Sequence, residues 1–220
     1  MLKCKLNSSN TFRSFLVENA DYEGFFELPK IKTSNLIPKK LVPFSRAMSQ
    51  KWNDFDCWVM FYEHDIKFER FWNNPKRYLT KLKKFNGVIS PDFSLYRNMP
   101  LCMQMWNTYR GRALATWLQD NAVEIIPNVR FNDERTYKFC FDGIEKFKTV
   151  AVGAHGCIKN QIDRAYFVKG LAQLVIRLHP KTIIVYGAAP DDTFKKYKDM
   201  GINIVPFESE FSMSRRQVTA

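Results

Sequence analysis

The feature that most constrains this fold is an alternation between short apolar runs and segments of helical character. Five apolar runs each finish in small or polar residues: GVISPDFS (87–94), VEIIPNVR (123–130), TVAVGAHG (149–156), TIIVYGAA (182–189) and INIVPFE (202–208). Such alternation is typical of a parallel sheet with crossover helices. Ligands bind these sheets beyond the carboxyl ends of the strands, so the sequence predicts where a site should lie.

We therefore expect an α/β fold with a single domain, about six mainly parallel strands and five crossover helices. The predicted strands are residues 57–62, 88–90, 123–126, 150–152, 182–186 and 202–205, and the predicted helices are 75–84, 100–119, 133–141, 161–178 and 190–200. Six strands are too few for a full eight-stranded barrel. An open doubly wound sheet and an incomplete barrel both fit this pattern.

The longest predicted helix shows which of its sides is buried. Apolar residues recur every four positions in it, at Leu101, Met105, Tyr109, Ala113 and Trp117. A stripe with this spacing packs on the core of a domain more often than it lines a site. We expect Trp117 to be a core residue and not a platform for stacking bases.

The ends of the chain differ from its middle. Residues 1–50 contain Pro29, Pro38 and Pro43 in a basic stretch, and this density of proline predicts an irregular basic N-terminal arm. Residues 51–211 hold the predicted α/β domain, and residues 212–220 are predicted to be a mobile tail. Hydrophobic residues make up 45% of the 220, which is enough for one well-buried core.

The cysteines and the apolar runs indicate a cytoplasmic protein. The five cysteines lie far apart and form no C-x-x-C pair, so reduced thiols are the simplest interpretation. The first residues, MLKCKLN, lack the apolar core of a secretory signal. The sequence contains no apolar stretch of the roughly 18 residues that a membrane span requires.

The net charge of +12 is concentrated in two blocks. Residues 30–51 hold six basic residues and no acidic one, and residues 67–84 hold seven basic residues and one acidic residue. Such an excess favours a polyanionic partner, most often nucleic acid, over a membrane surface. A solvated surface and an acidic protein partner are the alternatives. The expected nucleic-acid contacts are Lys39, Lys40, Arg46, Lys76, Arg77, Lys83 and Lys84.

A string of motifs resembles one family. The motifs are GVISPDFSLY (87–96), MWNTYR (105–110), IPNVR (126–130), FDG (141–143), GAHGC (153–157) and VYG (185–187), and the resemblance spans residues 50–210. The family consists of uncharacterised proteins of bacteriophages, plasmids and integrated mobile elements, and is known only as a domain of unknown function. The resemblance implies a mobile genetic element in a bacterial host cell, and it carries over no catalytic residue.

Asp92 and His155 are the candidate catalytic residues. Asp92 follows the predicted strand at 88–90, where a carboxylate could act as a base or bind a metal ion, or could cap the next turn. His155 follows the strand at 150–152, where an imidazole could serve as an acid–base group, or could belong to a plain surface turn. Both residues are expected at loop starts outside the core, so Asp92→Asn and His155→Ala should cost little stability.

Phosphate recognition is expected at two neighbouring strand ends. Asn128 and Arg130 follow the strand at 123–126, and an arginine there suits a phosphate or a carboxylate, although an ion pair with Asp133 or Glu134 is the alternative. Gly153 and Gly156 flank His155 and would let the backbone approach a ligand closely. Because the carboxyl ends of parallel strands meet at one edge, we expect Asp92, Arg130 and His155 to converge on one site.

A magnesium-dependent reaction is a further hypothesis. Glu63, His64 and Asp65 follow the first predicted strand and, with Asp92 and Glu208, could supply a carboxylate cluster for phosphodiester chemistry. The spacing of known zinc motifs is absent, so the metal stays unassigned, with magnesium as one option.

Three functional hypotheses follow from these features. The first is a nucleic-acid-binding protein of a phage or mobile element, with or without phosphodiester chemistry at the strand ends. The second is an enzyme or sensor of a small phosphorylated ligand. The third is an interaction protein that blocks a host factor.

Overall fold

Seven short strands run parallel in the order in which they occur along the chain. The computed structural model describes residues 12–157 and 160–209. Strands β3 (Leu41–Pro43), β4 (Trp58–Met60), β5 (Gly87–Ile89) and β6 (Ile125–Ile126) form one parallel sheet, and β7 (Thr149–Gly153), β8 (Thr182–Tyr186) and β9 (Asn203–Phe207) form another.

A single parallel bridge joins the two sheets. Asn128 pairs with Ala151 there, the amide of Val129 donates to the carbonyl of Ala151 at 2.8 Å, and the amide of Ala151 donates to the carbonyl of Pro127 at 2.9 Å. Strand order therefore follows sequence order from β3 to β9, as in a (β/α) barrel, whereas a doubly wound sheet reverses its order. The structure confirms the α/β fold and selects the incomplete barrel: β3 and β9 end the order within the described residues.

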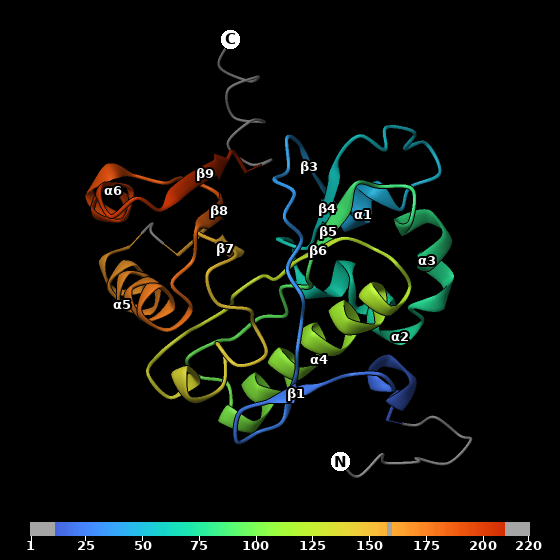
Figure 1. Ribbon diagram of the computed structural model, residues 1–220, viewed down its shortest axis with the longest axis horizontal. Helices are drawn as coiled ribbons and strands as arrows, with labels where there is room; N and C mark the ends of the chain where they lie inside the picture. The colour runs from blue at the N-terminus through green and yellow to red at the C-terminus, as the bar shows by residue number, and fades with distance from the viewer. Residues whose placement is uncertain (1–11, 158–159, 210–220) are drawn as a thin grey trace.

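The helices surround the strands on the outside (Figure 1). Helices α5 (Gln161–Leu178) and α6 (Asp191–Asp199) lie on one side of the molecule, and α1 (Phe44–Ala47), α2 (Glu69–Asn73) and α3 (Lys76–Leu82) lie on the opposite side. Helix α4 (Leu101–Asp120) crosses between them. The remaining elements are 3-10 turns η1 (Ser14–Val17), η2 (Asp65–Lys67) and η3 (Thr136–Lys138) and the antiparallel pair β1 (Tyr22–Glu23) and β2 (Leu28–Pro29).

Three apolar clusters fill this arrangement. Alternate residues of the strands face inward and form one cluster that draws on all seven strands, including Trp58, Ile126 and Ile184. The other residues face outward, where β3–β6 pack on α1–α4 and β7–β9 pack on α5 and α6. Trp117 is 6% exposed and its ring contacts Phe15 edge-on at 6.1 Å, which confirms that it is a core residue, whereas Leu101, Met105 and Tyr109 of the predicted stripe are only half-buried.

Several predicted elements differ from the observed ones. Strand β3 lies inside the segment predicted to be irregular. Pro43 does not prevent this strand, because proline is tolerated at the end of a short edge strand. Residues 133–141 form only the 3-10 turn η3 and not a crossover helix. The predicted tail at 212–220 lies outside the described residues. No helix in the described part of the chain is long and apolar enough to cross a membrane.

Candidate ligand site at the carboxyl ends of the strands

Three predicted site residues meet where β5 and β6 end. The Nδ2 of Asn128 donates to Oδ1 of Asp92 at 2.7 Å, and Nη1 of Arg130 donates to Oδ2 of the same carboxylate at 3.2 Å. Arg130 thus forms its ion pair with Asp92 and not with Asp133 or Glu134, the alternative that the sequence left open, and Asp133 pairs with Arg135. We call Asp92, Asn128 and Arg130, with Tyr62, the strand-end cluster.

Neighbouring strands hold the strand-end cluster in place. The backbone amide of Asn128 donates to Oγ of Ser90 at 2.8 Å, and the hydroxyl of Tyr62 donates to Oδ1 of Asn128 at 3.0 Å. The Tyr62 ring stacks on Tyr186 of β8 with centroids 4.9 Å apart. Residues from four strand ends therefore support one another, and the carboxylate of Asp92 has little freedom to move.

The electrostatics of the strand-end cluster reflect its burial. Asp92 is 7% exposed, so the prediction that it lies outside the core is wrong. Burial raises the pKa of Asp92, while Arg130 and the hydrogen bond from Asn128 oppose this shift. Asp92 in turn raises the pKa of Arg130, and burial raises the pKa of Tyr62 well above its usual value. Both oxygens of Asp92 are occupied, so the geometry favours a role in holding Arg130.

A cavity of about 570 Å³ opens beside Arg130, and we call it the strand-end cavity. It lies between the ends of β6 and β7, the start of α5 and the loop at residues 95–98. Its apolar lining consists of Leu95, Val129, Phe131, Val152 and Phe167. Its polar lining includes Tyr96, Arg97, Arg130, Asn132, His155 and Asp163. Apolar walls with a few charged groups are typical of small-molecule sites.

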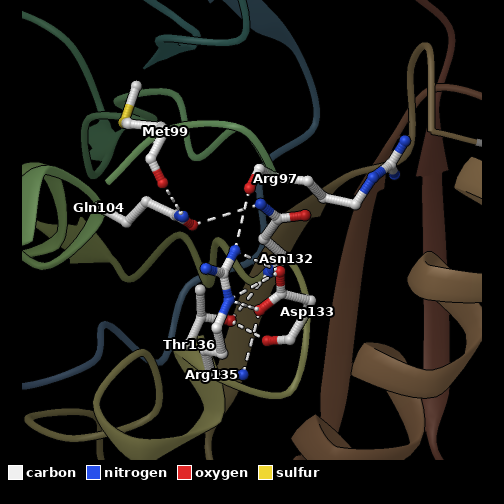
Figure 2. Close-up of polar contacts among 7 residues, drawn as sticks. All are labelled: Arg97, Met99, Gln104, Asn132, Asp133, Arg135 and Thr136. Atoms are coloured by element: carbon white, nitrogen blue, oxygen red, sulfur yellow. Dashed lines mark hydrogen bonds and ion pairs between the residues drawn. The ribbon is translucent and has the colours of Figure 1, made fainter. Parts of the chain in front are cut away.

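A polar network fixes one wall of the strand-end cavity (Figure 2). Gln104 of α4 donates to the carbonyl of Met99 at 2.9 Å and accepts from Asn132 at 3.2 Å. Arg135 donates to the carbonyl of Arg97 at 2.9 Å, while the guanidinium of Arg97 points away from the network (Figure 2). The loop at 95–98 is thus tied to both α4 and the segment after β6.

The Arg97 guanidinium reaches α5 across the mouth of the strand-end cavity. It pairs with Asp163 at 2.6 Å and lies 4.7 Å from the centroid of the Tyr166 ring. Asn160 caps the start of α5: its side chain accepts from the Asp163 amide at 2.8 Å and donates to the Asp163 carboxylate. Because of these contacts, two walls of the strand-end cavity are joined at the rim.

His155 and the two glycines lie on the β7 side of the strand-end cavity. His155 is exposed, and its backbone amide donates to the carbonyl of Tyr186 at 3.2 Å. A Cβ at Gly153 would come within 2.9 Å of the Tyr62 ring, so this glycine makes room for a side chain of the strand-end cluster. Gly156 has a φ of +82°, which favours glycine. The catalytic and phosphate-binding roles of these residues stay predictions.

The carboxylates after β4 bind the protein's own groups. Glu63 accepts from the amide and hydroxyl of Ser45 at 2.8 and 2.5 Å, and Asp65 accepts from the amide and hydroxyl of Ser94 at 3.1 and 2.8 Å. Among residues 12–157 and 160–209, no group of three His, Cys, Asp or Glu side chains is arranged to hold a metal ion. The hypothesised cluster with Asp92 is therefore not assembled.

The predicted nucleic-acid contacts lie just before β3, in α1, and in and directly after α3. We call the face formed by these residues the basic face: Lys39, Lys40, Arg46, Lys76, Arg77, Lys83 and Lys84. All seven side chains are exposed. Lys40 and Arg46 lie 5.9 and 5.1 Å from the Trp52 ring centroid, and Lys84 lies 5.5 Å from that of Phe55.

Several residues of the site were not predicted from the sequence. Tyr62 follows β4 and could have been found by the argument that identified Asp92. Arg97 and Tyr166 come from a loop and from the middle of a helical pattern, and only the folded structure brings them to the strand-end cavity. Cys157 also lines the strand-end cavity, and burial raises the pKa of its thiol. It gives no reactive thiolate signal.

The comparisons with known proteins agree on one context. The family described as Domain of unknown function (DUF4417) matches residues 20–208. Over 163 residues, or 74% of this chain, the Gene 1 proteins of Mycobacterium phages L5 and D29 are 31% and 30% identical to it. The matched segment covers 71% of the L5 protein and 60% of the D29 protein. No solved structure is significantly similar to the chain.

Proposed function

The chain belongs to the phage-associated family described as Domain of unknown function (DUF4417), and on that premise we propose that it binds nucleic acid through the basic face. A phage protein with this property would work on nucleic acid in the cytoplasm of the bacterial host cell. The proposal concerns binding: it assigns no chemical step to the strand ends.

The observation that carries the proposal is that two basic blocks far apart in sequence meet in space. Nζ of Lys81 in α3 donates to the carbonyl of Ser49, just after α1, at 2.6 Å. Arg70 of α2 lies 5.5 Å from the Phe44 ring centroid in α1 and 5.8 Å from that of Tyr78 in α3. These contacts place the three helices side by side (Figure 1). Basic residues on neighbouring helices suit a phosphate backbone.

The chemistry around the basic face supports the same partner. Helix α3 contains no acidic residue. Trp52 and Phe55 are half-buried, and Arg46 and Lys84 lie over their rings. If these cations moved to a bound phosphate, the ring faces would be open to stack with a base. Lys40 pairs with Asp54, but both side chains are well exposed, so this pair is a weak competitor for phosphate.

Fluorescence anisotropy with labelled oligonucleotides, measured over a series of salt concentrations, tests the proposal. Log affinity should fall linearly with log salt. Changing Lys39, Lys40, Lys83 and Lys84 together to Gln should flatten the slope by about 3, because each lost phosphate contact contributes about 0.7–0.9. Single-stranded and duplex oligonucleotides of the same length should both be titrated.

A matched variant on the opposite side of the fold controls for net charge. Lys169, Lys181, Lys195 and Lys196 are exposed on α5, α6 and the loop before β8. Changing these four to Gln removes the same charge and should leave most of the slope intact. Equal effects of the two variants would contradict the proposal, because affinity would then follow net charge and not the basic face. No binding at low salt would also contradict it and would favour an acidic protein partner.

A further inference from the structure

The strand-end cavity has the shape and composition of a small-molecule site that is separate from the basic face. Its volume of about 570 Å³ falls within the roughly 300–1,000 Å³ of ordinary ligand pockets. Leu95, Val129 and Val152 are buried and supply an apolar lining. The cavity lies next to α5, and the basic face lies over α1 and α3 on the other side of the molecule (Figure 1).

Arg130 is built to hold an anion in this cavity. Nη1 of its guanidinium donates to Asp92. Within the described residues, Arg130 forms an ion pair with Asp92 alone. The side chain keeps 27% of its surface exposed and lines the strand-end cavity. A guanidinium that is held from behind by a buried carboxylate is pre-organised, so it loses little entropy when it binds an oxyanion.

The charges on the wall favour a ligand with negative charge. Arg97 and Arg130 line the strand-end cavity with one carboxylate, that of Asp163, while the Asp92 carboxylate that balances Arg130 is buried outside the lining. Asp163 is already bound to Arg97 at 2.6 Å. Arg130 therefore supplies the local charge that a phosphate would meet.

The remaining side chains favour an aromatic ring on the same ligand. Tyr96 is 54% exposed on the loop wall, and Tyr166 is half-buried on α5 opposite. The Arg97 guanidinium lies over the Tyr166 ring, 4.7 Å from its centroid, so a base would pack on the part of the ring that Arg97 leaves open. The buried apolar lining would desolvate a heterocycle.

We propose that the strand-end cavity binds a mononucleotide, with its phosphate on Arg130 and its base against Tyr96 and Tyr166. The strand-end cluster is then the support that positions Arg130. His155, at the rim beside β7, is placed to contact the phosphate or the sugar. This proposal stands on different residues from the basic face and is independent of nucleic-acid binding.

Isothermal titration calorimetry tests the proposal on the full-length protein. The probes are adenosine 5′-monophosphate, the other three ribonucleoside 5′-monophosphates, adenosine and inorganic phosphate. At least one mononucleotide should bind, and both adenosine and inorganic phosphate should bind about 10-fold or more weakly, since each lacks half of the contacts.

Two variants assign the two halves of the ligand. Arg130→Gln should lower mononucleotide affinity to that of the nucleoside, and Tyr166→Ala should lower it towards that of inorganic phosphate. Arg177→Gln is the matched control: Arg177 is exposed near the opposite end of α5, and its variant should bind normally. Thermal unfolding of each variant checks that it is folded. If the Gln variant does not fold, Arg130→Lys replaces it. The lysine keeps the positive charge beside Asp92 but lacks the forked guanidinium, so mononucleotide affinity should still fall.

Three results would overturn the proposal. The first is that none of the four mononucleotides binds. The second is that nucleoside and mononucleotide bind equally well. The third is that a folded Arg130 variant keeps the mononucleotide affinity of the unchanged protein.

Discussion

The basic face and the strand-end cluster hold their charges in opposite ways. The side chains of the basic face are exposed: Lys40, Arg46, Lys76 and Lys84 lie over aromatic rings, and Lys40 also pairs with Asp54 on the surface. In the strand-end cluster, Asp92 is 7% exposed and both of its oxygens are bound. As the binding sites proposed above, the basic face would act through the sum of many exposed charges, and the strand-end cluster through the placement of one guanidinium.

This difference predicts which substitutions affect stability and which affect binding alone. An exposed lysine can be neutralised with little effect on the fold. A buried carboxylate that holds an arginine cannot be neutralised without leaving that arginine poorly paired. Substitution of a core residue should have a larger effect on the free energy of unfolding than either kind of charge change.

Trp117→Ala should have the largest effect on stability. Trp117 packs in the apolar cluster between α4 and strands β3–β6, and its removal leaves a large cavity. We expect a loss of about 3–5 kcal/mol in the free energy of unfolding, measured by urea denaturation. A variant with a near-normal denaturation midpoint would mean that α4 does not pack as described.

Asp92→Asn should come next. The substitution keeps the shape and removes the charge beside Arg130, so we expect a loss of about 2–3 kcal/mol, less than for a fully buried pair because Arg130 is partly exposed. Asp199→Asn is the control, since Asp199 pairs with Lys195 on the exposed surface of α6. Equal stability of the two variants would show that burial of Asp92 has no energetic consequence.

Tyr62→Phe should have a smaller effect. It removes the hydroxyl that donates to Asn128 and keeps the stacking on Tyr186. A neutral hydrogen bond of this kind contributes about 0.5–1.5 kcal/mol, so the denaturation midpoint should fall slightly. If the proposed site is correct, mononucleotide affinity should fall as well, because Asn128 would hold Asp92 less firmly. An unchanged mononucleotide affinity would mean that Asp92 positions Arg130 without support from Tyr62.

The four-lysine variant of the basic face should show the smallest effect on stability. Its denaturation midpoint should equal that of the unchanged protein, because the four side chains are exposed. A marked loss of stability would mean that the basic face has a structural role, and a change in its salt slope could then no longer be assigned to lost phosphate contacts.

The strands and longest helices could be predicted because their signals are local. Strand β8 and helix α5 have the bounds that the sequence predicts, since a continuous apolar run and a clear helical period leave few alternatives. Strand β3 was missed because it is three residues long and ends in Pro43, which reads as a turn. The selection of an incomplete barrel required the bridge between Asn128 and Ala151, a contact that has no sequence signal.

The candidate site divides in the same way. The convergence of Asp92, Arg130 and His155 was predicted because parallel strands bring their carboxyl ends to one edge. Asp92 and Arg130 do pair, and His155 lines the strand-end cavity with Arg130. The burial of Asp92 was not predicted, because it depends on side chains from neighbouring strands, such as Tyr62. Likewise, Arg97 reaches the strand-end cavity through a loop whose position depends on Gln104 and Arg135.

The most direct test of the account is a crossed binding experiment on one set of folded variants. Oligonucleotide and mononucleotide affinities are both measured for the four-lysine variant of the basic face and for Arg130→Gln. We predict a double dissociation: the lysine variant loses oligonucleotide affinity and keeps mononucleotide affinity, and Arg130→Gln does the reverse. Loss of both ligands in either variant, with the fold intact, would contradict the separation of the two sites.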